Sequence, residues 1–151
     1  MTWNELRELR RHEISVGSHT VNHPELHRMT PTAVEEEIRQ SKDTIEDRLG
    51  EPICSFSYPF AFPERDKGFT MTLQGLLEKH GYENGVSTII GTATGESSRF
   101  FLPRLPVNSY DDLRLFEAKL EGSYNWLHGP QYLFKTLKTV LPKYQRTTNL
   151  N

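Results

Sequence analysis

Residues 30–59 read TPTAVEEEIRQSKDTIEDRLGEPICSFSYP and carry the pattern that decides the fold. Thr30 suits an N-cap, Pro31 suits the first helical position, and Gly50 is typical of a helix end. Pro52–Tyr58 then reads as a buried strand, which Pro59 ends. One face of the predicted helix is formed by residues at near-helical spacing, namely Ala33, Val34, Glu37, Ile38, Ser41, Ile45 and Leu49.

The alternation of helix and strand continues on both sides of this stretch. Upstream, Thr2–Glu5 has the spacing of a capping box that begins a helix, and Ile14–Gly17 alternates as a short strand. This order favours parallel β-α units over a sandwich, so we expect an α/β fold. Downstream we expect a helix over Thr70–His80, a strand over Val86–Ile90, a short strand within Leu102–Val107 and a helix capped by Ser109–Asp112.

Composition excludes several classes of protein. A chain of 151 residues has room for one hydrophobic core, and we expect a single globular domain. Eighteen Lys and Arg against twenty Asp and Glu leave no basic run for nucleic acid, and no apolar stretch is long enough for a membrane span. One cysteine, Cys54, allows neither an internal disulfide nor a cysteine-rich zinc site. The first residues lack the pattern of a signal peptide, so the sequence leaves localisation open.

Chemistry is concentrated in the segment Gly17-Ser18-His19-Thr20-Val21-Asn22-His23-Pro24, at the end of a predicted strand. Two imidazoles four residues apart can face one ion, and zinc accepts neutral imidazole nitrogen. A catalytic zinc site typically has three protein ligands, and this pair supplies two. The glutamate between histidines that marks many metalloproteases is missing. By spacing alone, such a pair is more often two incidental surface residues.

The wider context resembles the NodB homology domain, the polysaccharide deacetylases of carbohydrate esterase family four. Its second motif reads His-Ser/Thr-x-x-His, which His19, Thr20 and His23 match. The resemblance implies that both histidines bind a divalent metal, usually zinc, and that Thr20 steadies their loop. The implied fold is a (β/α) barrel. Because closing a parallel barrel takes about 200 residues or more, we expect an incomplete one.

Phe56-Ser57-Tyr58-Pro59-Phe60 is similar to the family's third motif. Ser57 and Phe60 replace an arginine and a tyrosine found in many members. The resemblance implies that Tyr58 and Pro59 contact substrate and that the backbone N–H of Phe60 holds the oxyanion. Arg104, within a segment similar to later strands of the family, would orient the catalytic base; an arginine flanked by prolines is as easily a solvated one.

Two family motifs are not matched. The first, an Asp-Asp pair supplying the general base and the third metal ligand, would precede Thr2, and Asp43, Asp47 and Asp66 are poor substitutes. The last, which supplies the acid for the leaving amine, has His128 as its sole candidate. We therefore expect weak Zn²⁺ binding and an open sheet edge prone to self-association. The resemblance covers residues 1–127 of one partial domain spanning 1–151, with a helical tail over 128–151.

The function implied by the resemblance is metal-dependent hydrolysis of N-acetyl groups on a hexosamine polysaccharide, impaired in a truncated or separately translated chain. Family members often act at the cell envelope. Two alternatives remain open at this point. One is a non-catalytic carbohydrate-binding or assembly module, and the other is an inactive gene relic. For the module, the aromatic residues available to stack on sugar rings are Trp3, Tyr58, Tyr124 and Trp126.

Overall fold

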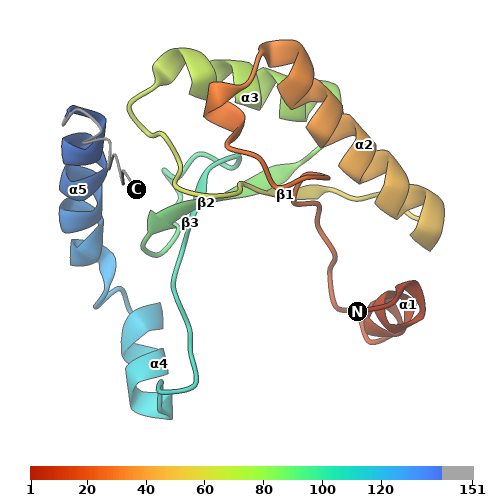
Figure 1. The fold of residues 1–151 in the computed structure, drawn as a ribbon. Helices are drawn as coiled ribbons and strands as arrows, with labels where there is room; N and C mark the ends of the chain where they lie inside the picture. The colour runs from red at the N-terminus through yellow and green to blue at the C-terminus, as the bar shows by residue number, and fades with distance from the viewer. Residues whose placement is uncertain (141–151) are drawn as a thin grey trace, which may run out of the picture.

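The computed structural model describes residues 1–140, in which helices alternate with the strands of one small sheet (Figure 1). Helices α2 and α3 lie together over the sheet, α1 stands at one side, and α4 and α5 lie at the other. No helix of residues 1–140 is both long and apolar enough to cross a bilayer. The elements in chain order are α1 (Trp3–Arg11), η1 (Leu26–Arg28), α2 (Pro31–Leu49), β1 (Ser55–Ser57), α3 (Lys67–Lys79), β2 (Asn84–Ile90), β3 (Leu102–Arg104), α4 (Leu113–Leu120), η2 (Asn125–Leu127) and α5 (His128–Val140).

All strands of the sheet run parallel, in the order β1-β2-β3. Ser18 extends the pairing beyond β1 through a parallel bridge to Phe56. Its N–H donates to the carbonyl of Ser55, and its carbonyl accepts from the N–H of Ser57. The predicted parallel α/β architecture is confirmed. The same edge of the sheet therefore carries the carboxyl ends of the segment at Ser18, of β1, of β2 and of β3.

Local sequence signals explain most helix boundaries. The capping box of Thr2 and Glu5 begins α1. Thr30 caps α2, which ends at Gly50 with a left-handed φ of 74°. Helix α3 begins three residues earlier than predicted, because the carboxylate of Asp66 accepts from the N–H of Phe69 and caps it. Of the predicted tail helix, His128–Val140 forms α5, and residues 141–151 lie outside the described part of the chain.

Strands β1 and β3 are shorter than the sequence indicated, whereas β2 begins two residues before the predicted strand over Val86–Ile90. The predicted strand over Pro52–Tyr58 shrinks to Ser55–Ser57, and that over Leu102–Val107 shrinks to Leu102–Arg104. Proline has no N–H to donate to a ladder; Pro52 and Pro59 lie on either side of β1, and Pro106 follows β3, which itself contains Pro103. The segment Ile14–Gly17 forms no ladder, and its pairing is limited to the single bridge at Ser18.

The core lies between the sheet and the pair of helices α2 and α3. Phe56 of β1 and Tyr58, which directly follows β1, are each 2% exposed and pack on the aromatic rings of Tyr82 and Phe62, respectively. The helices contribute Val34 and Ile38 from α2 and Leu73 and Leu77 from α3, with Leu26, Ile53 and Phe100 completing the cluster. This packing fixes α2 against the strand that precedes the candidate site.

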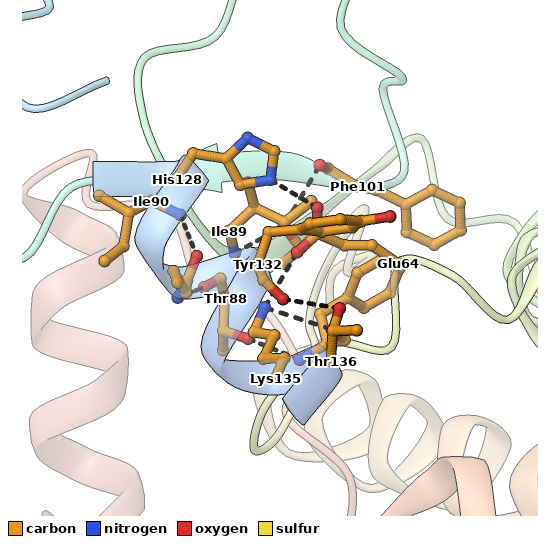
Figure 2. A network of polar contacts seen from close by, with 12 residues as sticks. Glu64, Thr88, Ile89, Ile90, Phe101, His128, Tyr132, Lys135 and Thr136 are labelled. Atoms are coloured by element: carbon orange, nitrogen blue, oxygen red, sulfur yellow. Dashed lines mark hydrogen bonds and ion pairs between the residues drawn. The ribbon is translucent and has the colours of Figure 1, made fainter. Parts of the chain in front are cut away.

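Helix α5 attaches to β2 through a side-chain amide (Figure 2). Gln131 accepts a hydrogen bond from the N–H of Ile90 at 3.1 Å and donates one to the carbonyl of Thr88 at 2.8 Å. Glu64, in the loop after β1, forms a hydrogen bond with His128 at 2.6 Å and an ion pair with Lys135 at 3.0 Å, so the start and the middle of α5 are tied to that loop.

We expect Gly85→Ala to destabilise the fold by about 1–3 kcal/mol, the usual range for overpacking. A Cβ at this position would lie 2.6 Å from the carbonyl oxygen of Phe100, which is backbone and cannot swing away. Gly75→Ala is the matched control, since α3 leaves open space there and alanine favours a helix. Urea unfolding of both variants measures the difference; equal stability of the Gly85 variant and the parent would contradict the packing described.

Candidate active site

The paired histidines lie at the carboxyl edge of the sheet. His19 directly follows the bridge residue Ser18, and Phe60 lies just beyond β1. The rings of His19 and His23 approach edge to face with centroids 4.8 Å apart, and the ring of His23 lies 4.5 Å from that of Phe60. Both imidazoles are exposed. In parallel α/β folds, the loops at this edge are where ligands bind.

One imidazole is fixed in a single tautomer. Nδ1 of His19 lies 2.7 Å from the carbonyl oxygen of Ser57. A carbonyl oxygen only accepts, so Nδ1 carries the proton and Nε2 keeps a free lone pair. A hydrogen bond from one ring nitrogen to a carbonyl is the usual arrangement of a metal-binding histidine. The His23 ring forms no hydrogen bond within residues 1–140.

The loop that carries the histidines has an uncommon backbone. Thr20 and His23 have φ of 66° and 52°, and Phe60 has 56°. Non-glycine residues rarely adopt this left-handed region, which costs of order 1–3 kcal/mol each and is often found at functional sites. The Thr20 hydroxyl accepts from the N–H of His23 at 3.0 Å. This contact lies where the sequence predicts a loop-steadying role for Thr20.

Sequence reasoning assigned no role in the site to Glu37 of α2. Its side chain is almost fully covered and accepts hydrogen bonds from the N–H groups of Val21 and Asn22 and from the Asn22 side chain. Burial alone would raise the pKa of this carboxyl, but the three hydrogen bonds, from the Asn22 amide first, bring it below its ordinary value. The sequence did hold a signal, which was a charged residue on the apolar face of a predicted helix.

Tyr82 joins the other end of the loop to α2. Its hydroxyl donates to the carbonyl of Ile38 at 3.2 Å and lies 2.6 Å from the hydroxyl of Ser18. Since a tyrosine has one hydroxyl proton, Ser18 is the donor in the second contact. Burial raises the pKa of Tyr82, and the hydrogen bond from Ser18 opposes the shift. The buried Ser18, next to His19, is thereby fixed to the core.

The third-motif residues divide into buried and exposed ones. Tyr58 and Pro59 are buried, so their side chains offer no surface to a ligand in this structure. The Tyr58 hydroxyl forms no hydrogen bond of good geometry in the described part of the chain; burial raises its pKa, and the nearby backbone N–H of His27 opposes the shift. Phe60 is 49% exposed. Its N–H donates to no group among residues 1–140, which leaves that donor free for a ligand.

Arg104 lies at the end of β3, and its guanidinium donates to the Ser57 hydroxyl at 3.2 Å. Ser57 thus contacts Arg104 through its side chain and His19 through its carbonyl. The structure brings His19, His23, Phe60 and Arg104 to one edge of the sheet. The chemical roles assigned to them stay predictions.

His128 belongs to a different cluster. It begins α5 and pairs with Glu64, which Lys135 also contacts (Figure 2). It forms no ring contact with His19 or His23, and its recorded partners are Glu64 and Tyr132.

Carboxylates that complete the histidine pair are not found in the described residues. No group of three or more His, Cys, Asp or Glu side chains within residues 1–140 is arranged to hold a metal ion. Asp43 pairs with Arg39, and Asp66 caps α3, so neither faces the imidazoles.

A pocket of about 520 Å³ opens beside the histidine pair. Phe60 belongs to both the histidine site and this pocket, because it contacts His23 and also lines the pocket. The other walls are η1 with its preceding residue, the loop over 61–66, and Tyr132, Lys135 and Thr136 of α5. Its volume lies within the range of about 300–1,000 Å³ common for ligand sites.

Residues 1–85 match the family described as Polysaccharide deacetylase. The chain belongs to the polysaccharide deacetylases. YxkH of Bacillus subtilis (strain 168), which its name places in the same family, is 31% identical over 122 residues, corresponding to 81% of this chain and 42% of that protein.

Solved deacetylase structures share the fold. The Streptococcus pyogenes deacetylase PplD, in complex with acetate, gives a TM-score of 0.70 at 23% identity over 80% of this chain and 50% of its own. BC0361, a polysaccharide deacetylase from Bacillus cereus, gives a TM-score of 0.64 at 23% identity, over 80% of this chain and 36% of its own. The deacetylase domain of BpsB from Bordetella bronchiseptica gives a TM-score of 0.57 at 18% identity, over 70% of this chain and 48% of its own. The chain spans half or less of each relative, and it has the deacetylase fold with part of the barrel.

Two buried tyrosines allow a matched test of how the site is anchored. We expect Tyr82→Phe to lower the free energy of unfolding by about 1–3 kcal/mol, because it leaves the buried Ser18 hydroxyl without its partner, whereas the Ile38 carbonyl keeps its bond from the Ser41 hydroxyl. Tyr58→Phe should change stability by less than about 1 kcal/mol, because the buried hydroxyl it removes forms no hydrogen bond of good geometry. Urea unfolding decides, and equal losses in the two variants would contradict the anchoring role of Tyr82.

Proposed function

We propose that this chain supplies the two-histidine part of the metal site of an enzyme that hydrolyses N-acetyl groups on a hexosamine polysaccharide. The observation that carries the proposal is the His19–Ser57 hydrogen bond. It leaves Nε2 of His19 with a free lone pair beside the ring of His23. Family membership and the acetate in the PplD structure, a product of such a reaction, agree with this chemistry.

The residues present fit a divalent ion of zinc type. Two neighbouring neutral imidazoles are ligands that Zn²⁺ accepts, and the carbonyl partner of His19 fixes the tautomer that binding requires. A catalytic zinc site has one more protein ligand. We propose that a carboxylate from a further segment or another chain supplies it, together with the general base.

The roles of this chain's residues follow from their positions. A bound divalent ion supplies Lewis-acid activation of the acetamide carbonyl and of water. His19 and His23 would hold that ion, while Arg104 and Ser57 keep the His19 ring oriented. The free N–H of Phe60 would donate to the oxygen on which negative charge develops, and removing a donor of this kind costs about 10²–10³ in rate. Its left-handed φ sets the direction of that N–H.

We propose that the pocket lined by Phe60 binds the sugar units next to the one that loses its acetyl group. Its walls combine the aromatic rings of Phe60 and Tyr132 with charged groups, and sugars stack on such rings while their hydroxyls seek polar partners. Arg28 pairs with Glu25 and Lys135 with Glu64, and the charges of Arg65 and Asp66 are opposite in sign, so the pocket has little net charge to reject a neutral acetylated sugar.

A second candidate function, a non-catalytic carbohydrate-binding module, is favoured by one observation. The indole of Trp126, on η2, is 68% exposed, away from the histidine pair in sequence and in its contacts. Sugar binding that survives both a chelator and His19→Ala, and is lost in Trp126→Ala, would favour this reading over the deacetylase site.

We expect the metal-free chain to bind Zn²⁺ with micromolar affinity or tighter, and His19→Ala and His23→Ala each to weaken it by at least about tenfold, or 1.4 kcal/mol. Calorimetric titration measures both. His12→Ala is the control, because His12 is an exposed imidazole paired with Glu8 at the end of α1. The proposed metal site would be contradicted if the parent and both site variants bound Zn²⁺ equally well, or if His12→Ala also lost affinity.

We also expect the isolated chain to release acetate from chitooligosaccharide or poly-N-acetylglucosamine at least about 100-fold more slowly than a longer polypeptide that adds the aspartate pair, because general-base catalysis contributes about 10²–10⁴ in rate. An acetate assay with and without chelator measures this. Rapid, chelator-sensitive release by the pure 151-residue chain would show that its own residues complete the site.

A further inference from the structure

Glu37 is a buried carboxylate whose partners are all N–H donors of one loop. Its exposed fraction is 8%, and no Lys, Arg or His pairs with it in residues 1–140. Oε2 accepts from the N–H of Val21 at 2.8 Å and of Asn22 at 3.0 Å, and Oε1 accepts from the Asn22 side-chain amide at 2.6 Å. A carboxylate taken out of water has to be compensated, and here the loop alone does so.

The two residues that Glu37 holds lie between the paired imidazoles. On either side of them, Thr20 and His23 have the left-handed φ values that raise the energy of the loop. Without an opposing interaction these residues would relax toward common conformations, and the rings of His19 and His23 would move apart. The hydrogen bonds to Glu37 act at the centre of this strained turn, so they are placed to oppose that relaxation.

We propose that Glu37 is a positioning residue, which holds the loop 19–23 in the conformation that lets both histidines face one ion. The proposal rests on the metal site proposed above. Glu37 acts through Val21 and Asn22 and touches neither imidazole. Charged acceptors form hydrogen bonds about twice as strong as neutral ones, which suits a group that works against backbone strain.

The position of Glu37 is itself well fixed. Its neighbours on α2, Val34 and Ile38, are in the hydrophobic core with β1 and α3. The carbonyl of Ile38 also receives the Tyr82 hydroxyl, which in turn accepts from Ser18 at the start of the loop. Helix α2 therefore holds the loop at two points, at Ser18 before His19 and at Val21–Asn22 between the histidines.

Two substitutions separate hydrogen bonding from charge. In Glu37→Gln, one amide oxygen can still accept from both backbone N–H groups, and the new NH₂ can donate to the Asn22 side chain once that amide has flipped, since its oxygen and nitrogen are interchangeable by rotation. Glu37→Leu has a similar size and no acceptor. Glu36→Leu is the matched control, since Glu36 is the adjacent, exposed residue of α2 and contacts only Arg39 and Gln40.

The test is Zn²⁺ calorimetry on the full chain, with circular dichroism to confirm the fold. We expect Glu37→Leu to weaken binding by about 10- to 100-fold, the usual effect of removing an outer partner of a metal site. Glu37→Gln should lose no more than about threefold, because neutral hydrogen bonds keep the geometry at roughly half the strength, and Glu36→Leu should match the parent. Unchanged affinity in Glu37→Leu, or equal losses in the Leu and Gln variants, would overturn the proposal.

A second variant changes the loop side of the contact between Glu37 and Asn22. Asn22→Ala removes one of the three hydrogen bonds at an exposed position where folding is not at risk. We expect it to weaken Zn²⁺ by about threefold, a fraction of the effect of losing all three. Should Glu37→Leu fail to fold, unchanged affinity in Asn22→Ala would overturn the proposal by itself.

Amide hydrogen exchange without metal distinguishes a failure of this proposal from a failure of the metal site. We expect the N–H groups of Val21 and Asn22 to be protected in the parent and in Glu37→Gln, and to exchange at least about tenfold faster in Glu37→Leu, because their acceptor is gone. If the parent binds no zinc but shows this pattern, the metal site is wrong and the positioning of the loop stands. If exchange is equally fast in all variants, the positioning role is wrong.

Discussion

Parallel pairing is the constraint on which the rest of the structure depends. Because the segment at Ser18, β1, β2 and β3 all run in one direction, residues that are far apart in sequence leave the sheet at the same edge. His19, Phe60 and Arg104 are brought together by this rule rather than by any contact among their side chains. The same register puts the Ser57 carbonyl within reach of the His19 ring, and so settles which nitrogen stays free.

Helix α2 converts this arrangement into a specific loop geometry. Its apolar side chains pack into the core, while a carboxylate and a carbonyl on the same helix hold the histidine loop. The same helix therefore both packs into the core and holds the loop that carries the histidines. A buried charge is tolerated there because the loop supplies three donors, and a strained turn is tolerated because the helix supplies the acceptors.

Much of this could be predicted from the sequence, because the signals were local. Thr30, Pro31 and Gly50 fix α2 by cap chemistry, and two histidines in a recognisable motif point to a metal. What could not be predicted depended on long-range pairing. Glu37 looks like one more helix position until the loop that it meets is in place, and Asp66 looks like a loop charge until it caps α3. The lengths of β1 and β3 were overestimated and that of β2 was underestimated, because hydrophobic runs do not reveal where a partner strand begins and ends.

The attachment of α5 has a consequence for how the sheet is completed beyond β1. On β2, the peptide groups of Val86, Thr88 and Ile90 face the same side; β1 pairs with the first of them and then stops at Pro59. The Gln131 amide bonds the Thr88 carbonyl and the Ile90 N–H, and so takes the place of the N–H and C=O of one residue in a strand that is not there. Among side chains, only those of asparagine and glutamine carry an amide, with a C=O acceptor and an N–H donor like those of the backbone. Backbone hydrogen bonds between strands persist through most point substitutions. The two bonds of Gln131 depend on one side chain, so a single substitution can create or remove them.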